Sequence, residues 1–477
     1  MDPIDARVSE QISLLLQPPS PLQQQEYFNH LLTSNNCHGI LQVKPSKDYG
    51  KGVYAETDFK EGDLVLKDEI LVGVQHSSNK IDCLVCSRCF RFIGSIELQI
   101  GRKLYLQGLG SQKGCSSSED SDVEDHLEAH TCPSNKSTIK YPLPAESVES
   151  LMHEKLALPY SKKFPLPSVI NCPGGCKEVY YCSNSCAQTD WDVCHSLLCT
   201  GEGPDSSRKK ALLKFIQHAN ETNDIFLLAA KAVSSIILSY RKLKDAFNKE
   251  KGKEKEKNHI SDVLSNHSFR LLLKAWEPFS MGYKRRWWDC VALPDDVDNS
   301  EEAAFRMQIK QLAFESLELL KEAIFDEEYL PLFSLEIYGH IIGMFELNNL
   351  DLVVASPVED YFLYVDDLPE AEKKEVDEIT QPILDALGED YSICCQGTAF
   401  FPLQSCMNHS CCPSGKAFKR DEDRDGQATI IACRLIKKGE EITISYIDED
   451  LELEERQALL ADYGFRCKCL RCIEEEA

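Results

Sequence analysis

Pairs of metal-ligand side chains are the most chemically specific feature of this sequence. Four pairs have their two members three or four positions apart: Cys86 and Cys89, Cys172 and Cys176, Cys182 and Cys186, and His195 and Cys199. This spacing sets two ligands about one turn apart, which suits two corners of the tetrahedron that Zn²⁺ prefers. Eight ligands therefore predict two closed zinc sites. Cys83 and Cys132 remain alternatives for the first pair, because about 80 residues separate that pair from the second.

A third set of thiols lies near the C-terminus. Cys467, Cys469 and Cys472 follow the spacing C-x-C-x2-C, and only residues 473–477 come after them. Three thiolates leave one corner of a zinc tetrahedron open, so the fourth ligand must come from an earlier segment. Cys411 is the candidate, and its neighbour Cys412 is the alternative. The sequence therefore predicts about three zinc ions per chain and a tail that folds back onto the loop around Cys411.

The second cysteine-rich block resembles a MYND zinc finger. The resemblance rests on residues 177–199, KEVYYCSNSCAQTDWDVCHSLLC, in which Tyr181 and Trp191 occupy the aromatic positions of that family. It implies that the ligand pairs interleave: the first and third pairs share one zinc ion, and the second and fourth share the other. It also implies a surface for proline-containing peptide partners.

Four further segments resemble, in order, the motifs of SET-domain lysine methyltransferases. They are GKGVYA (residues 50–55), ELNNLDL (346–352), SCMNHSCCPS (405–414) and GEEITISY (439–446), and the cysteine tail follows them. A MYND finger inside such a domain is typical of the SET-and-MYND subfamily. No helical-repeat domain follows the tail, so the chain is most similar to a shorter branch, the plant Trithorax-related SET proteins with a MYND insertion. Ser414 departs from the asparagine that usually follows NHSCxP.

This resemblance implies S-adenosylmethionine as the methyl donor and gives roles to individual residues. The cofactor-binding residues would be Tyr49, Gly50, Lys51, Asn348, Asn408, His409, Tyr446 and Phe465. Asn408 and His409 would contact the amino-acid and adenine portions of the cofactor, and Phe465 would pack on the adenine. The catalytic residues would be Tyr446, whose hydroxyl orients the methyl group and the target nitrogen, and Tyr463, which would line the lysine channel.

Methyl transfer to lysine makes two physical demands on such a site. The lysine side chain has an ordinary pKa near 10.4, so removing its proton at pH 7 costs roughly 4–5 kcal/mol. The neutral amine must then lie in line with the methyl group on the sulfonium centre. A narrow, aromatic-lined channel meets both demands, because it desolvates the amine and aligns it. No covalent intermediate is needed, and no Ser/His/Asp arrangement is evident in the sequence.

Composition and charge restrict the partners. The 477 residues carry 52 basic and 78 acidic side chains, a formal net charge of −26. This balance disfavours direct binding to nucleic acid or an anionic membrane, and it favours a basic partner such as a histone tail. The most apolar stretch, residues 225–240, contains Lys231 and is too short to span a bilayer. Because no signal-peptide pattern opens the chain, we expect a soluble protein of the nucleus, or also of the cytoplasm, with reduced cysteines.

The order of the motifs predicts an α+β protein. Its β-rich SET fold would be split by a MYND finger and a helical insert and completed by a C-terminal post-SET zinc site. The expected parts are an N-terminal arm (residues 1–36), the N-terminal part of the SET domain (37–82), the MYND finger with a long acidic insertion (83–199), the helical insert (200–330), the catalytic part (331–466) and the cysteine tail (467–477).

Periodicity and turn signals predict the elements that position these residues. Helices are expected at residues 208–247, 300–325 and 451–463, and strands at 49–74 and 428–446. The last two strands should lie on either side of a Lys-Gly turn, and short β-rich runs should follow Leu330. The N-terminal arm should be helical but loosely packed. The acidic stretch 116–130 and the lysine-rich run 249–257 should be solvated loops.

Other functions are compatible with part of the pattern. A scaffold that binds proteins through its MYND finger would have a SET domain with weak or absent methyltransferase activity, but the intact Asn408, His409 and Tyr446 favour the enzyme. A lysine methyltransferase for non-histone proteins would have the same motifs. A RING-like ubiquitin ligase would share the interleaved zinc sites but leaves the SET motifs unexplained.

Overall fold

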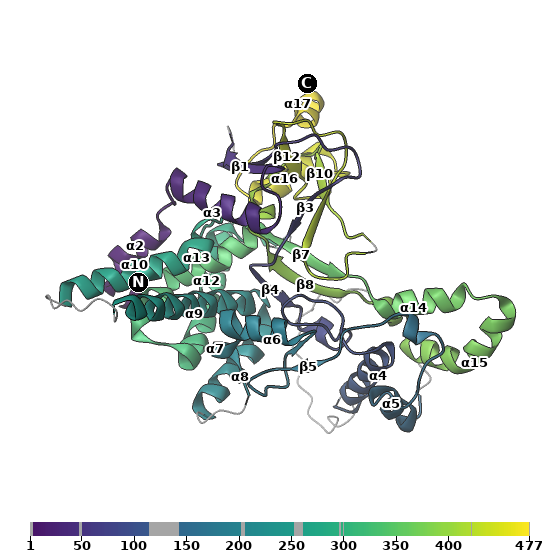
Figure 1. Cartoon of the computed structure of the whole chain (residues 1–477). Coiled ribbons are helices and arrows are strands. Elements are labelled where there is room, and N and C mark those ends of the chain that lie inside the picture. Colours follow the sequence, from purple (N-terminus) through teal and green to yellow (C-terminus); the bar gives the residue numbers. More distant parts are fainter. Residues whose placement is uncertain are drawn as a thin grey trace.

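The computed structural model describes residues 3–46, 50–113, 143–201, 206–251, 261–294, 297–298, 300–420 and 422–476 (Figure 1). Runs of strands and runs of helices follow one another along the chain, and the strands form small sheets beside helical segments, so the predicted α+β class is confirmed. Tyr49, Cys132, the acidic stretch 116–130 and most of the lysine-rich run 249–257 lie outside the described residues.

A four-stranded sheet brings three of the SET motifs together. Its strands lie in the order β1 (Leu41–Pro45), β2 (Lys51–Ala55), β12 (Glu441–Ile444) and β9 (Asn408–His409). β12 runs antiparallel to β2, with Ile442 opposite Val53, and parallel to β9, with Thr443 beside Asn408. Along β12, Ile442 and Ile444 are buried, and Glu441 and Thr443 are half-buried. This alternation fixes the register, because a slip by one residue would expose both isoleucines.

Three smaller sheets complete the β structure. They contain β10 (Gly415–Ala417), β11 (Ala428–Ala432) and β3 (Leu64–Asp68); β4 (Val72–Gln75), β8 (Cys395–Phe400) and β7 (Asn349–Val354); and β5 (Ile170–Asn171) with β6 (Tyr180–Tyr181). The two strands expected within residues 428–446 are β11 and β12, but they belong to different sheets rather than to one hairpin. Between them, Ile436 exchanges two backbone hydrogen bonds of 2.9 Å with Phe59, so the connecting segment pairs with another part of the chain.

A group of helices packs beside the sheets, on the left in Figure 1. It contains α8 (Ser206–Thr222), α9 (Ile225–Lys251), α10 (Ser261–Ser280), α11 (Trp287–Cys290), α12 (Glu302–Ile324) and α13 (Leu335–Asn348). Their apolar faces share one hydrophobic core, in which Phe226, Leu317 and Ile337 are fully buried. Helices cover both segments that periodicity predicted to be helical in this region. None of the described helices is long and apolar enough to cross a membrane.

The prediction of short β-rich runs after Leu330 is wrong for most of residues 335–387. This part of the chain forms α13, α14 (Pro357–Asp366) and α15 (Glu370–Leu387). The hydroxyl of Ser334 caps α13 by accepting a hydrogen bond from the backbone nitrogen of Ile337 (3.1 Å). α13 is buried on nearly every side, so its apolar residues show no helical stripe and the pattern resembles a buried strand. α14 and α15 lie beside α4 (Ile96–Lys113) and α5 (Ala145–Met152), on the right in Figure 1.

The N-terminal arm is helical, as predicted, but it is not loose. It forms α1 (Pro3–Arg7), α2 (Ser9–Leu16) and α3 (Pro21–Ser34), and Ser20 and Gln23 form a capping box at the start of α3. Leu15 is only 1% exposed, and its backbone oxygen accepts a hydrogen bond from the indole nitrogen of Trp276 (2.7 Å). The prediction of loose packing is therefore wrong, because the few apolar side chains of the arm insert into the core.

Short helices complete the finger and the C-terminal region. They are η1 (Ser78–Lys80), η2 (Ser161–Lys163), α6 (Asn184–Asp190), the π-helical turn η3 (Trp191–His195), α7 (Ser196–Leu198), η4 (Glu327–Phe333), η5 (Gly388–Ser392), η6 (Gln404–Cys406), α16 (Leu453–Asp462) and α17 (Leu470–Glu476). α16 is the last helix predicted from the sequence. The loop after it leads into the cysteine tail and packs against Tyr446.

Candidate functional site

A cavity of about 680 Å³ lies where the four-stranded sheet, α13 and the C-terminal tail meet. Its lining includes all the described residues that the sequence assigned to the cofactor and the lysine channel: Gly50, Lys51, Asn348, Asn408, His409, Tyr446, Tyr463 and Phe465. These residues come from segments far apart in the chain, and only the fold brings them together. The volume lies within the range of small-molecule sites, roughly 300–1,000 Å³.

The Asn408 side chain connects β9 to β12, the strand beside it, and to β2, the next strand of the sheet. Its side-chain nitrogen donates to the backbone oxygen of Lys51 (3.0 Å) and to Oε1 of Glu441 (2.7 Å). A Cβ atom at position 52 would lie 2.2 Å from the same carboxylate oxygen, so a larger residue there would displace the Glu441 side chain. The two hydrogen bonds fix where the Asn408 amide lies at the cavity.

Tyr446 lies at the centre of an aromatic group. Its ring centroid is 5.2 Å from that of Tyr463, 5.4 Å from that of His409 and 6.4 Å from that of Phe465. Its hydroxyl donates a hydrogen bond to the backbone oxygen of Met407 (2.6 Å). Burial raises the pKa of Tyr446 well above its ordinary value, and it also raises the pKa of Tyr463. Both hydroxyl groups are therefore protonated at neutral pH.

The opposite side of the cavity is formed by α13 and the segment after α10. The side-chain nitrogen of Asn348 donates to the backbone oxygens of Tyr283 and Met344, both at 2.7 Å. The ammonium group of Lys51 donates to the backbone oxygen of Met281. These bonds hold the GKGVYA segment, the ELNNLDL segment and residues 281–284 together around one space.

Lys284 is a cavity residue that sequence reasoning missed. Its ammonium group donates to three backbone oxygens, those of Ser280 (2.9 Å), Gly282 (3.1 Å) and Phe279 (3.3 Å). Burial, with a smaller effect from the charge of Lys51, lowers the pKa of Lys284 to about 7. Its only sequence signal is the run of three basic residues before Trp287, which is also typical of a solvated loop.

The C-terminal cysteines form a compact group next to the cavity. The sulfur atoms of Cys411, Cys467, Cys469 and Cys472 all lie within 4.8 Å of one another, whereas the alternative ligand Cys412 is exposed and outside the group. The side chain of Gln457 exchanges two hydrogen bonds with the backbone of Cys467 (2.9 and 3.0 Å). The tail thus folds back onto the Cys411 loop.

Two more groups lie in the finger, each formed from two of the four pairs. Cys86 and Cys89 meet Cys182 and Cys186, and Cys172 and Cys176 meet His195 and Cys199. This is the interleaved arrangement that the MYND resemblance implied. Cys83, the alternative ligand, lies outside both groups and instead donates to the backbone oxygen of Ile393 (3.5 Å).

The donor atoms of all three groups fit zinc. A tetrahedral ion with Zn–S bonds of about 2.3 Å places its sulfur ligands about 3.8 Å apart. Neighbouring sulfur atoms lie 3.6 Å apart for Cys89 and Cys182, 3.7 Å for Cys172 and Cys199, and 3.6 Å for Cys411 and Cys472. Each group therefore has the ligand number, ligand type and spacing of a structural zinc site.

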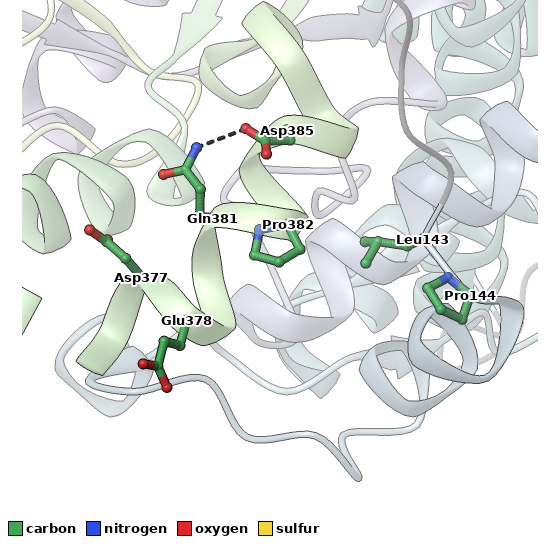
Figure 2. Close-up of a pocket in the computed structure, with 7 residues that line it drawn as sticks. All are labelled: Leu143, Pro144, Asp377, Glu378, Gln381, Pro382 and Asp385. Atoms are coloured by element: carbon green, nitrogen blue, oxygen red, sulfur yellow. Dashed lines mark hydrogen bonds between the residues drawn. The ribbon is translucent and has the colours of Figure 1, made fainter. Parts of the chain in front are cut away.

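Another hollow, between α15 and the segment before α5, shares no residue with these sites (Figure 2). Asp377, Glu378 and Asp385 line it, and the amide nitrogen of Gln381 donates to Asp385 (2.7 Å). Among the residues that the structure describes, no aromatic, cysteine or histidine side chain contributes to its lining. It offers neither an aromatic channel nor a set of zinc ligands, so the cavity around Tyr446 is the candidate active site.

Comparisons with known proteins show the family of the chain. Residues 50–447 match the family model described as SET domain. Over 476 residues the chain is 63% identical to the histone-lysine N-methyltransferase ATXR2 of Arabidopsis thaliana, a match that covers 99% of this chain and 98% of that protein. It is 24% identical over 324 residues to the mouse protein-lysine N-trimethyltransferase SMYD5, which covers 64% of this chain and 66% of that protein. The chain therefore belongs to the SET-domain family, as its motifs had predicted.

Proposed function

We propose that this chain is an S-adenosylmethionine-dependent protein-lysine N-methyltransferase that acts on histone tails, of the H3 type, in the regulation of transcription. The observation that carries the proposal is the convergence of Asn348, Asn408 and Tyr446, from three distant motifs, on one cavity. The high identity to a protein named as a histone-lysine N-methyltransferase, over almost the whole chain, supports the same chemistry and substrate class.

The first group of side chains would hold the cofactor. It consists of Gly50, Lys51, Asn348, Asn408, His409 and Phe465, with Tyr446 at its edge and Tyr49 outside the described residues. Amide and backbone groups suit the charged amino-acid portion of S-adenosylmethionine, and an aromatic face suits its adenine. When bound, this cofactor supplies an electrophilic methyl group on a sulfonium sulfur.

The second group, Tyr446 and Tyr463, would form the lysine channel. A buried space between aromatic rings disfavours an ammonium ion more than a neutral amine, so it lowers the pKa of a lysine side chain that enters it. The hydroxyl of Tyr446 donates a hydrogen bond to the backbone oxygen of Met407, and its own oxygen keeps lone pairs that can accept one. In this proposal one lone pair accepts an N–H of the target amine and so orients the nitrogen lone pair toward the cofactor.

The three ligand groups would bind about three structural zinc ions. The two ions in the finger would hold a MYND module that recognises proline-containing peptides. The third ion, bound by Cys411 and the tail cysteines, would keep Tyr463 and Phe465 against Tyr446. All three aromatic side chains pack against the cluster that contains these cysteines. The division of the chain into six parts, which the sequence predicts, belongs to the same proposal.

The substrate would be a basic, lysine-containing protein tail, which the net charge of −26 attracts. We place the protein in the nucleus, because that is where histone tails are found. A methyl-transfer assay tests the proposal: purified protein is incubated with S-adenosylmethionine and a panel of histones and nuclear extract, and products are identified by mass spectrometry. Methylated histone lysines are expected. Tight cofactor binding without methylation of any protein in the panel would instead support the scaffold function.

A further inference from the structure

A second cavity, of about 390 Å³, lies between the finger and the helices behind it. Its lining comes from β4, α4, the finger segment 177–180, and helices α8 and α9, and it includes none of the residues that line the candidate active site. We call it the basic cavity, after the four cationic residues in its lining: Lys80, Arg102, Lys177 and Lys231. In a chain with a net charge of −26, Glu178 is the only carboxylate residue among the described residues that line the same space.

Three cations of the basic cavity are Lys80, Arg102 and Lys231. Two of them donate hydrogen bonds to backbone oxygens, and the third has no hydrogen-bond partner among the described residues. Lys231 donates to the backbone oxygen of Gly73 (2.7 Å), and Nη1 of Arg102 donates to those of Lys80 (2.7 Å) and Ile81 (3.2 Å). The ammonium group of Lys80 has no hydrogen-bond partner within the described part of the chain. Carboxylates within 4.0 Å of any of the three are likewise absent there. None of the three therefore forms an ion pair among the described residues, and the carboxylates of Asp224 and Glu178 act on Lys80 only from a greater distance.

The positive charges of Lys80 and Lys231 act on each other in a half-buried space. Burial lowers the pKa of Lys80, and the nearby charge of Lys231 adds to this effect. The charges of Asp224 and Glu178 act in the opposite direction on Lys80, but neither carboxylate lies within 4.0 Å of its ammonium group, and one oxygen of Asp224 accepts hydrogen bonds from the nitrogen (2.9 Å) and hydroxyl (3.3 Å) of Ser77. Like charges that share a half-buried space are unfavourable unless an anion joins them.

Apolar side chains form the rest of the lining. Leu84, Phe90, Leu212 and Phe215 are between 1% and 6% exposed, and the partly buried Leu227 joins them. An apolar pocket with a few convergent polar groups is the usual form of a small-ligand site. This combination fits a ligand that has both an anionic group and an apolar body.

We infer that the basic cavity is a binding site for a carboxylate carried on an apolar body, with Lys80 and Arg102 as its charge-recognising residues. Arg102 offers the planar fork that pairs with carboxylates, and Lys80 offers an unpaired ammonium group. Such a carboxylate can come from a free acyl acid or from an acidic peptide side chain next to a bulky apolar residue. The inference does not depend on methyltransferase activity.

The test is a fluorescence titration of the full, zinc-loaded protein with anilinonaphthalene sulfonate, a probe that carries an anionic sulfonate in place of the carboxylate on an apolar aromatic body. The variant that combines Lys80→Gln with Arg102→Gln should bind this probe about tenfold more weakly, the equivalent of one lost charge-assisted hydrogen bond. Lys242→Gln is the matched control, because Lys242 is an exposed lysine that does not line the cavity. It should change the affinity by less than about twofold.

Competition then identifies the source of the carboxylate. Displacement of the probe by decanoate supports a free acid, and displacement by a short peptide of alternating Glu and Leu supports a peptide ligand. Failure of both to displace it, or equal probe affinity in the double variant and the wild type, overturns the inference. The single variant Lys80→Gln loses no hydrogen bond or ion pair among the described residues, so it should keep the wild-type zinc content and melting temperature. A weaker affinity for the probe in that variant still supports the site.

Discussion

The imidazole of His409 links the tail cysteines to the candidate catalytic tyrosine. Its Nδ1 accepts a hydrogen bond from the backbone nitrogen of Tyr446 (3.0 Å), and its Nε2 lies 3.3 Å from the sulfur of Cys411. One side chain therefore contacts both a proposed zinc ligand and the residue proposed to orient the amine. His409 is therefore one direct link between the tail cysteines and Tyr446, in addition to the aromatic packing, and the two residue-scale predictions concern the two ends of this link.

The first concerns the Tyr446→Phe variant. Its ring still fills the aromatic group, so stability should fall by less than about 1.5 kcal/mol for the lost hydrogen bond to Met407. Cofactor affinity should survive, because the Asn348 and Asn408 amides are unchanged. The methylation rate should fall by about 10²-fold or more, as for the loss of one oriented hydrogen-bonding group at the reacting centre of other enzymes. Steady-state rates, a binding titration and a melting curve measure the three effects.

The control for this variant is Tyr105→Phe, which changes a half-exposed tyrosine of α4 outside the cavity. It should leave all three measurements unchanged. If Tyr446→Phe unfolds, Tyr446 is chiefly a core residue. If it folds, binds the cofactor and methylates at the normal rate, it has no part in the mechanism.

The second residue-scale prediction concerns Arg456, which is fully buried beside the tail cysteines. Its Nη2 lies 3.8 Å from the sulfur of Cys472 and also contacts Glu475. Four thiolates around Zn²⁺ carry a net charge of −2, and a buried guanidinium offsets part of it. We expect Arg456→Gln to lose zinc faster to a chromogenic chelator. Its free energy of unfolding should be about 1–3 kcal/mol lower than that of the wild type.

Arg466→Gln is the matched control for Arg456→Gln. Arg466 belongs to the same tail and pairs with Glu476 (2.8 Å), but its side chain is 65% exposed. An exposed pair contributes at most about 1 kcal/mol. Equal rates of zinc release from the two variants would contradict a charge-balancing role for Arg456.

At the scale of the elements, the sequence predicted segments with local signals and missed those defined by distant partners. Residues 302–324 carry a one-sided apolar stripe, so α12 was predictable almost to the residue. α13 carries no stripe, because the rest of the fold surrounds it. The arm lacks a long apolar run, so its docking was not predictable either. β11 and β12 were identified as strands, but nothing local in them specifies that they belong to different sheets.

The same reasoning explains the candidate site. Asn408 and Tyr446 belong to compact motifs whose residue types are visible within ten positions of sequence, and both line the cavity. Lys284 was missed because its low pKa arises from burial beneath segments that are remote in sequence. The wall formed by Pro18 and Pro19 was missed for the same reason: the arm reaches the cavity only after α2 has docked.

That wall leads to a prediction for α2. Leu15→Ala removes a buried side chain at the end of the helix that precedes Pro18 and Pro19, and it should cost about 2–5 kcal/mol of unfolding free energy. It should also weaken cofactor binding, because the proline segment lines the same cavity as Asn408. Leu22→Ala changes a side chain that is 65% exposed and should shift stability by less than about 0.5 kcal/mol. Unchanged cofactor affinity in a folded Leu15→Ala variant would contradict this role of the arm.

For the whole molecule, the prediction is about three zinc ions per chain. Twelve ligand side chains form three separate groups, and each has a complete set of four. Metal analysis of purified protein that has not met a chelator should therefore give a ratio near three. A ratio of one or less would contradict the assignment.

The three ions should not be equivalent for activity. Cys469→Ser removes one ligand of the tail group, on which Tyr463 and Phe465 pack, so we expect weaker cofactor binding together with lower stability. Cys89→Ser removes one ligand in the finger, away from the cavity, and should lower stability with little change in cofactor affinity. Equal cofactor affinity in the wild type and Cys469→Ser would contradict the link between tail and cavity.

The distance in sequence between Cys411 and Cys472 also determines the order in which a growing polypeptide can become active. Both finger groups have all their ligands once Cys199 has been synthesised, so the finger can take up metal early. The tail group has only Cys411 until translation reaches residues 467–472. Because Tyr463 and Phe465 are made long after Cys199, the lysine channel can be assembled only after the finger. A nascent chain that stalls before Cys472 would carry a complete finger and no working cavity.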